Sequence, residues 1–279
     1  VKLKLNLWVS FVSNCVALLY YKTYRNNQSD EWVAFIHGAG GSSSIWFRQI
    51  KSFKSQFNVL LIDLRGHGKS QEAFQRYFSN DHSFENISKD IIEVLDHLKI
   101  EKAHFVGISL GTIIIRTLCE IAPERVQTLI LGGAVTRLNV RSKFLVAVGN
   151  ALKRFVPFMW LYRLFAWIIM PKKRNAESRD LFIGQAKRVC QHEFMKWFKL
   201  TNNINPLLKY FNEKETTAPT LYLMGDEDYM FLPQVLKLVS HHKNAWLNIL
   251  DNCGHVCNVE QPDEFNKLSI AFIRTHSLS

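Results

Sequence analysis

The pentapeptide Gly107-Ile108-Ser109-Leu110-Gly111 places one serine between two glycines, after one apolar run and before another. A strand, a tight turn and a helix are typical of such a pattern, and the serine then lies exposed at the turn. The glycines are needed because larger flanking residues would collide with the neighbouring backbone. Negative charge is stabilised at a helix N-terminus, so the pattern indicates that Ser109 can act as a nucleophile.

A serine hydroxyl needs a base to accept its proton, and that base needs an acid to orient it. Candidate residues lie in Gly225-Asp226-Glu227-Asp228 and in Asn252-Cys253-Gly254-His255, each of which follows an apolar run. Both loops are expected at the carboxyl ends of parallel strands, the edge at which α/β sheets bind ligands. The sequence therefore predicts that a serine, an acid and a histidine meet at one edge of a sheet.

Three patterns that would indicate other chemistry are incomplete. Gly68-Lys69-Ser70 matches the end of a phosphate-binding loop, but Asp63 occupies the position at which that loop requires glycine. The glycines of Gly38-Ala39-Gly40-Gly41 lack the spacing of a dinucleotide site. Cys253-Gly254-His255-Val256-Cys257 has metal-binding residue types, but no second ligand cluster occurs elsewhere. We therefore expect neither a metal nor an organic cofactor.

Composition and charge narrow the class of protein. The chain has 279 residues, 47% of them hydrophobic, which suits one large domain or a core with an insertion. Five cysteines without paired spacing indicate no disulfide framework, so a reducing, cytoplasmic location is expected. The formal charge is +11, and residues 136–217 hold the whole excess, with 16 Lys and Arg against 5 Asp and Glu. A basic region confined to one segment favours a local anionic partner over nucleic acid.

Apolar runs that alternate with amphipathic helices predict a mostly parallel α/β sheet. The runs are continuous rather than alternating, which is typical of strands buried on both faces. The expected strands are 32–36, 57–62, 103–106, 128–131, 220–224 and 245–250. Besides the helix that follows Ser109, the expected helices are 45–53, 87–98, 232–240 and 265–273.

Alternating apolar residues at 1–11 and 16–20, on either side of Ser13-Asn14, predict an N-terminal antiparallel hairpin. A signal peptide is the alternative for this region, but polar residues interrupt it and no small-residue cleavage site follows. The stretch is also too short and too polar to span a membrane.

Five short motifs together resemble the α/β-hydrolase superfamily. They are His37-Gly38, Asp63-Leu64-Arg65-Gly66-His67-Gly68, Gly107-Ile108-Ser109-Leu110-Gly111, Gly225-x-x-Asp228 and Gly254-His255. Their order of serine, acid and histidine is that of the superfamily. The resemblance is to the small single-domain branch, which includes esterases, lactonases, carbon–carbon bond hydrolases and cofactor-free haloperoxidases.

The resemblance implies a role for each of three side chains. Ser109 would be the nucleophile, His255 the general base and then the general acid, and Asp228 the group that orients the imidazole. The Gly-x-x-Asp spacing of the family selects Asp228, with Asp226 as the alternative acid. Otherwise Asp226 and Glu227 would be solvated loop charges.

The resemblance also implies an oxyanion hole made by two backbone N–H groups. One belongs to Leu110, the residue after the nucleophile, and the other to Ala39, which follows His37-Gly38. His37 and His67 lie in family motifs, but we expect them to shape loops by hydrogen bonding rather than to act as bases.

The expected reaction is hydrolysis of a carboxylic ester, thioester or lactone through an acyl-Ser109 intermediate, with no cofactor. A carbon–carbon bond hydrolase or lyase is one alternative. Relatives of that type that make menaquinone precursors place an arginine soon after the serine. Here the first is Arg116, about two helical turns away. The other alternative is a ligand-binding signalling protein that turns over slowly.

The predicted strands stop near Gly133 and resume near residue 220, which indicates that an insertion splits the sheet. We expect residues 1–135 and 218–279 to form an α/β-hydrolase core and residues 136–217 to form a helical lid over Ser109. The pocket beneath is expected to be apolar and aromatic, favouring a small-molecule substrate with a hydrophobic acyl or aryl group.

The centre of the predicted lid, Phe155–Met170, reads as a helix that starts near Pro157, stops at Pro171 and is apolar on every face. Such a helix is buried against the core and substrate or lies at a membrane. Lys153-Arg154 and Lys172-Lys173-Arg174 flank it and would suit anionic headgroups. The sequence thus leaves two alternatives open, a lid packed on the core and peripheral contact with an anionic membrane.

Overall fold

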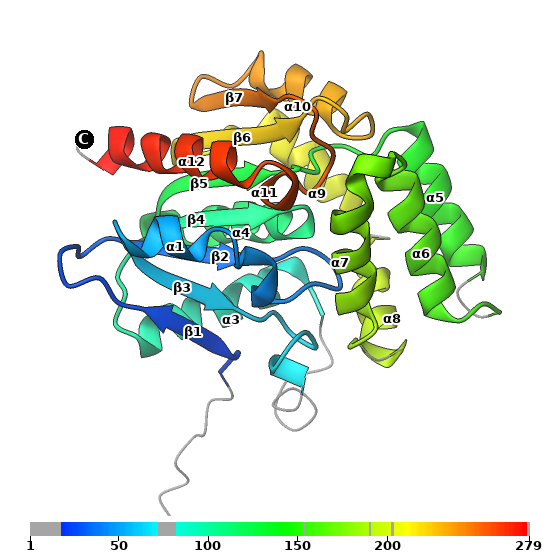
Figure 1. The fold of residues 1–279 in the computed structure, drawn as a ribbon, viewed down its shortest axis with the longest axis horizontal. Coiled ribbons are helices and arrows are strands. Elements are labelled where there is room, and N and C mark those ends of the chain that lie inside the picture. Colours follow the sequence, from blue (N-terminus) through cyan, green and yellow to red (C-terminus); the bar gives the residue numbers. More distant parts are fainter. Residues whose placement is uncertain (1–17, 72–81, 153–154, 190, 202–203, 278–279) are drawn as a thin grey trace, which may run out of the picture.

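The computed structural model describes residues 18–71, 82–152, 155–189, 191–201 and 204–277. Its centre is a seven-stranded sheet of order β1-β3-β2-β4-β5-β6-β7 (Figure 1). β1 runs antiparallel to β3, and the other neighbours are parallel, as the sequence predicts. The strands are β1 (Tyr21–Tyr24), β2 (Trp32–Ile36), β3 (Asn58–Ile62), β4 (Ala103–Ile108), β5 (Val126–Gly132), β6 (Thr220–Gly225) and β7 (Ala245–Leu250).

The antiparallel strand at the N-terminal edge begins at Tyr21, after the 16–20 stretch in which it was expected. Residues 1–11, the first arm of the predicted hairpin, lie outside the described residues. β1 pairs with β3 along its whole length, from Tyr21 opposite Ile62 to Tyr24 opposite Val59. The sheet therefore has the expected antiparallel edge, in which β1 pairs with β3.

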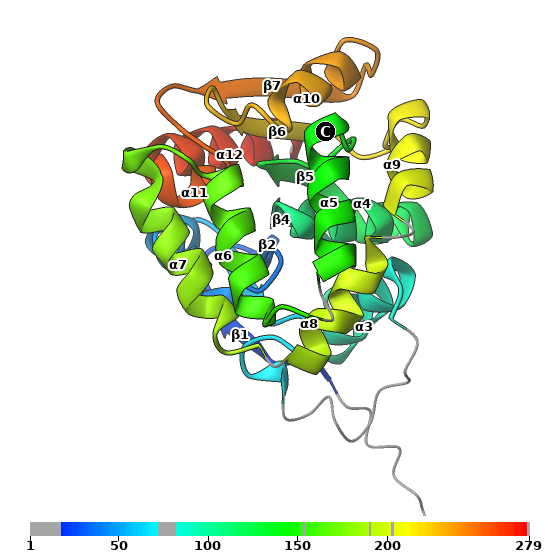
Figure 2. The same ribbon diagram turned by 90° about the vertical axis from the view of Figure 1, so that its right-hand side faces the viewer.

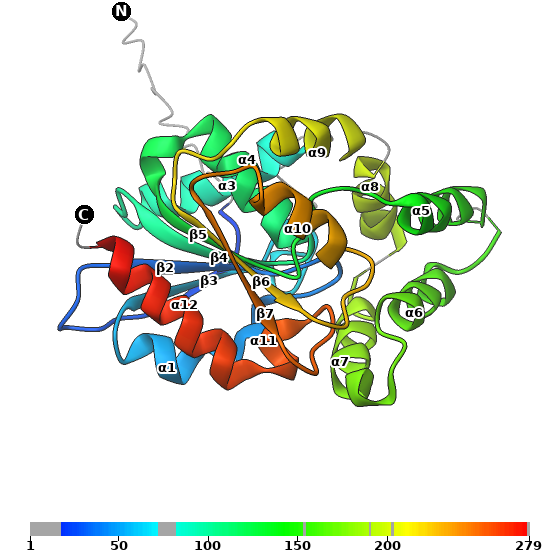
Figure 3. The same ribbon diagram turned by 90° about the horizontal axis from the view of Figure 1, so that it is seen from above.

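Helices cover both faces of the sheet (Figure 3). Successive residues of β2 show why: Ala34 and Ile36 belong to one buried cluster, and Val33 and Phe35 to the other. One face carries α3 (Phe84–His97), α4 (Leu110–Ile121), α9 (Ile204–Glu213) and α10 (Leu232–Val239). The other carries α1 (Ile50–Lys54), α11 (Cys257–Glu260) and α12 (Pro262–Ser277). Short 3-10 turns occupy Ser43–Trp46, Pro123–Arg125 and Lys173–Asn175.

Four more helices gather at one end of the molecule, beyond the carboxyl ends of the parallel strands (Figures 1 and 2). They are α5 (Val140–Leu152), α6 (Phe158–Ile169), α7 (Ala176–Ala186) and α8 (Gln191–Leu200). α6 begins directly after Pro157. Proline suits a helix start because the first N–H groups of a helix have no partner within it, and proline has no N–H. None of the described helices combines the length and the apolarity that a membrane crossing requires.

Helix α9 falls within the segment predicted as a lid, yet it packs beside α4 on one face of the sheet (Figure 3). Its Leu208 and Phe211 are buried in the same cluster as Leu118 of α4. The guanidinium of Arg116 also lies 4.7 Å from the centre of the Phe211 ring. The position of α9 thus depends on contacts with the core, whereas α5–α8 extend beyond the strands.

Candidate active site

Ser109 lies at the turn between β4 and α4, with φ 53° and ψ −119°. A positive φ is unusual for a residue other than glycine and stores backbone strain of about 1–3 kcal/mol. The turn is also crowded, since a Cβ on Gly111 would lie 2.4 Å from the carbonyl oxygen of Ile36. A Cβ on Gly107 would lie 2.9 Å from the backbone of Gly111. Glycine is therefore required on both sides of the serine.

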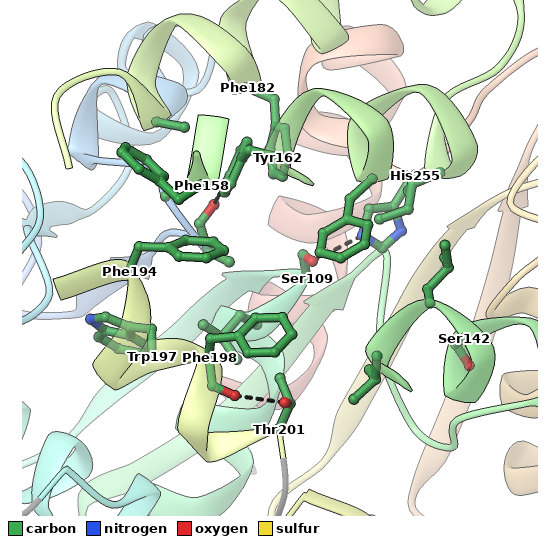
Figure 4. Close-up of a pocket in the computed structure, with 18 of the residues that line it drawn as sticks. Ser109, Ser142, Phe158, Tyr162, Phe182, Phe194, Trp197, Phe198, Thr201 and His255 are labelled. Atoms are coloured by element: carbon green, nitrogen blue, oxygen red, sulfur yellow. Dashed lines mark hydrogen bonds between the residues drawn. The ribbon is translucent and has the colours of Figure 1, made fainter. Parts of the chain in front are cut away.

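A chain of two hydrogen bonds links Ser109 to Asp228 through His255. The Ser109 Oγ lies 2.9 Å from His255 Nε2 (Figure 4). On the other side of the ring, His255 Nδ1 lies 2.7 Å from Asp228 Oδ2. Asp228 is 1% exposed, and its other oxygen accepts the Phe231 N–H at 3.2 Å. With the carboxylate accepting from Nδ1–H, Nε2 is left as the proton acceptor that faces the serine hydroxyl.

The two acidic neighbours of Asp228 have structural partners of their own. Asp226 accepts the backbone N–H of Cys253 at 3.0 Å and so supports the loop that carries His255. Glu227 is 7% exposed and pairs with Lys172 at 2.8 Å and Arg174 at 3.2 Å. The interpretation of these carboxylates as solvated loop charges is therefore wrong for Glu227, which is buried against two cations, whereas Asp226 is an exposed loop residue that also accepts a backbone N–H.

Ala39 and Leu110, the two residues expected to form an oxyanion hole, line the same cavity as Ser109. Leu110 is the first residue of α4, so its N–H has no acceptor within that helix. The peptide group after Ala39 is held from two sides. Tyr162 of α6 donates its hydroxyl proton to the Ala39 carbonyl. The Gly40 N–H of the same peptide group donates to His67 Nε2 at 3.0 Å.

His37 and His67 each hold a loop through both ring nitrogens. His67 Nδ1 lies 2.7 Å from the Arg65 carbonyl, and His37 Nδ1 lies 2.8 Å from the Gly38 carbonyl. The Nε2 of His37 accepts the Leu64 N–H at 3.0 Å, as His67 Nε2 accepts a backbone N–H. Burial lowers the pKa of His67 to about 3 and also lowers the pKa of His37. Both rings are therefore neutral and fully used in loop contacts, as expected.

The Ser109 hydroxyl opens into a cavity of about 240 Å³ between the sheet edge and α5–α8 (Figure 4). The described residues that line it include none that is acidic, and no lysine or arginine. Aromatic rings dominate its wall: Phe158, Tyr162, Phe165, Phe182, Phe194, Trp197, Phe198 and Phe231. Two of them, Tyr162 and Phe182, stack with their centroids 4.4 Å apart. The cavity therefore suits a neutral, hydrophobic ligand group.

Comparison with known proteins supports the fold. A profile of the alpha/beta hydrolase fold family matches residues 31–167, which include Ser109 and its loop partners 37–41 and 63–68. The crystal structure of the enol-lactonase from Burkholderia xenovorans LB400 superimposes with a TM-score of 0.74, at 20% identity, over 92% of this chain and 96% of that one. The chain has the α/β-hydrolase fold.

Curated relatives of this chain include hydrolases. It is 28% identical over 268 residues to a 2-hydroxy-6-oxononadienedioate/2-hydroxy-6-oxononatrienedioate hydrolase of Comamonas testosteroni, covering 87% of both chains. It is also 26% identical over 258 residues to the dihydrolipoyllysine-residue acetyltransferase component of an acetoin cleaving system of Pseudomonas putida. That match covers 88% of this chain but only 64% of the Pseudomonas protein.

The other candidate sites of this chain have structural roles. Burial raises the pKa of the Cys253 and Cys257 thiols, which opposes the thiolate form that binds metals. In the described ranges no three His, Cys, Asp or Glu side chains are grouped so that they could hold a metal ion. Arg116 is buried and pairs with Glu120 and the Lys214 carbonyl rather than lining the cavity.

Two contacts between residues 136–217 and the site could not be expected from the motifs. One is the Tyr162 hydroxyl, which is hidden in an otherwise apolar helix and reaches the Ala39 carbonyl. The other is the pair of cations, Lys172 and Arg174, on buried Glu227 beside Asp228. The lone tyrosine hydroxyl in an apolar helix was an available signal, because a buried hydroxyl needs a partner. Nothing in the sequence pairs the cations with Glu227.

Proposed function

We propose that this protein is a serine hydrolase that cleaves a carboxylic ester, thioester or lactone carrying a hydrophobic acyl or aryl group. One observation carries the proposal: the hydrogen-bonded chain Ser109–His255–Asp228 opens into an aromatic cavity without charged side chains among its described lining. In this proposal residues 136–217 are the lid, since this segment supplies most of the residues that line the cavity, and its helix α9 anchors it on the core.

The proposed reaction begins when the Ser109 Oγ attacks the substrate carbonyl carbon and its proton passes to His255 Nε2. Asp228 keeps the imidazole in the required tautomer and stabilises the imidazolium. The N–H groups of Ala39 and Leu110 would hold the oxyanion. His255 then protonates the leaving group, and an acyl-Ser109 ester remains. Water that loses a proton to His255 hydrolyses that ester and restores the serine hydroxyl.

The cavity wall limits the substrate class. A carboxylate in the acyl group would need a cation or several hydrogen-bond donors, because burying an unpaired charge is costly. The described wall offers apolar side chains and a few neutral polar groups, among them Ser142 and Thr201. The Comamonas relative is named for dioates, which carry two carboxylates. We therefore infer a neutral substrate for this chain, unlike the one in that name.

A series of nitrophenyl esters from acetate to decanoate tests the proposal. Each methylene buried in the cavity contributes about 0.8 kcal/mol, so kcat/KM should rise with chain length and exceed that for acetate by about 3,000-fold at octanoate. Beyond the length that fills the cavity the rise should stop. A strong preference for acetate would contradict the apolar acyl site, and turnover of none of the esters would contradict the esterase proposal.

A carbon–carbon bond hydrolase is the second candidate, because the Comamonas relative at 28% identity is named as a hydrolase of 2-hydroxy-6-oxo-dioates. The same serine, histidine and aspartate would serve it. An assay with a 2-hydroxy-6-oxo-dienoate bearing an apolar substituent, beside the same compound bearing a carboxylate, separates the candidates. Cleavage of either compound at rates above those for the best nitrophenyl ester would favour carbon–carbon hydrolysis.

Replacement of Tyr162 by phenylalanine tests the link between α6 and the proposed oxyanion hole. The variant keeps the ring stacked on Phe182 and removes the hydrogen bond to the Ala39 carbonyl. We expect kcat to fall about tenfold with KM little changed, because the Ala39 N–H is then less well oriented. Tyr210→Phe, which removes a hydroxyl bonded to Glu120 on α4, is the matched control and should leave kcat unchanged. A Tyr162→Phe variant that alters only KM would contradict this role.

A further inference from the structure

The outer side of α6 is apolar and exposed. Trp160, Leu164, Trp167 and Ile168 are 67%, 42%, 54% and 38% exposed, at the spacing of one helical stripe. The inner side of the same helix is also largely apolar, with Leu161 and Ala166 2% and 0% exposed. An ordinary surface helix presents charged or polar residues on the side away from the core. α6 therefore has apolar residues on two sides, and the described protein covers only the inner side.

The stripe continues onto the neighbouring helix. Figure 2 shows α5 and α6 side by side at the face of the molecule toward the viewer, and the views of Figures 1 and 3 agree. They touch where a Cβ on Gly149 of α5 would lie 2.9 Å from the Phe165 ring of α6. Phe144 of α5 is 66% exposed, and Phe155, between the helices, is 83% exposed. We call these two phenylalanines and the four α6 residues the outer apolar face.

The segment that carries this face is cationic throughout. Residues 126–176 contain nine Lys and Arg and no Asp or Glu. Arg163 lies exposed within the α6 stripe, and Lys143 lies exposed on α5 beside Phe144. Lys173, at the end of α6, is also exposed. Exposed tryptophan, phenylalanine and leucine with lysine and arginine around them are the composition of helices that lie in the interface of an anionic membrane.

We propose that the outer apolar face docks this protein on the surface of an anionic lipid bilayer, with α5 and α6 lying in the headgroup region. The tryptophan and phenylalanine rings enter the boundary between headgroups and acyl chains, and Arg163, Lys143 and Lys173 contact lipid phosphates. A second copy of the chain fits the same face poorly, because two such faces would oppose cations of the same sign. The inner sides of α5 and α6 line the cavity, so docking places the cavity wall at the lipid surface.

Co-sedimentation with vesicles tests the proposal. Wild-type protein should bind vesicles of phosphatidylcholine with about 30% phosphatidylglycerol at low salt. It should bind these vesicles more weakly at high salt, and it should bind vesicles of phosphatidylcholine alone more weakly at any salt. The double variant Trp160→Ser/Trp167→Ser should lower the partition coefficient at least about tenfold. Arg163→Gln should lower it about fivefold, and only on anionic vesicles. Trp246→Ser, which alters a 42% exposed tryptophan on the edge strand β7, is the matched control and should bind like wild type.

A second measurement uses the unaltered protein. Brominated lipids quench tryptophan only at close range, so wild-type fluorescence should fall on brominated anionic vesicles, and the double variant should lose that extra quenching. Failure of wild-type protein to bind anionic vesicles at low salt would overturn the proposal. So would equal binding by the double variant, or a dimer in light scattering that the double variant abolishes. Docking does not depend on the proposed chemistry, so Ser109→Ala should bind vesicles like wild type. Vesicle binding thus tests the docking proposal, and ester turnover separately tests the proposed function.

Discussion

Replacing Ser109 by alanine should lower kcat for the best nitrophenyl ester by about 10⁶-fold and abolish labelling by a fluorophosphonate probe. The loss is expected because Ser109 Oγ is the atom that would form the acyl bond, and His255 Nε2, 2.9 Å away, would have no proton to accept. The fold should persist, since the side chain occupies a turn that opens into the cavity rather than the packed core.

Intact-protein mass spectrometry measures the label directly, and thermal melting shows whether Ser109→Ala has folded. Ser142→Ala is the control, because Ser142 lines the same cavity from α5 and should keep both labelling and turnover. Full labelling of Ser109→Ala would contradict the assignment of the nucleophile. Labelling of wild-type protein without turnover of any substrate tested would instead favour the alternative of a slow, ligand-binding protein.

Replacing Asp228 by asparagine should lower kcat by about 10⁴-fold. The carboxylate accepts His255 Nδ1–H at 2.7 Å, and an amide nitrogen in that position would favour the tautomer with the proton on Nε2. That tautomer cannot accept the proton of Ser109. The charge that stabilises the imidazolium is lost in the same change, so the effect falls on kcat rather than on KM.

Asp226→Asn is the matched control for Asp228→Asn. Its amide oxygen can still accept the Cys253 N–H, which Asp226 accepts at 3.0 Å, so kcat should change by less than about fivefold. Steady-state kinetics of both variants on one ester decide the point. A larger loss from Asp226→Asn than from Asp228→Asn would move the proposed acid to position 226.

Much of the fold could be predicted because it depends on local patterns. β2 occupies the predicted range 32–36, since a continuous apolar run bounded by polar turns is typical of a strand buried on both faces. β7 also occupies its predicted range, 245–250, although it is an edge strand and largely exposed. The residues of the candidate site were located for a similar reason. Each lies in a short motif directly after a strand, and parallel strands bring their carboxyl ends to one edge.

Tertiary structure decided what depends on partners distant in the chain. Glu227 looks like a surface carboxylate in the sequence, and it is buried because Lys172 and Arg174 approach it from the segment before α7. Tyr162 looks like one more apolar residue of α6, and only the fold brings its hydroxyl to the Ala39 carbonyl. Sequence spacing cannot specify such pairs, because their geometry depends on how α5–α8 pack against the sheet edge.

The sequence by itself determined that α6 has apolar residues on every side, because eleven of its twelve residues are uncharged and only Arg163 carries a charge. Only the packing decided which side is covered: Leu161 and Ala166 face the protein, and Trp160 and Trp167 face outward. Composition sets how much apolar surface a helix has, whereas the neighbours that remove it from water are supplied by the rest of the chain.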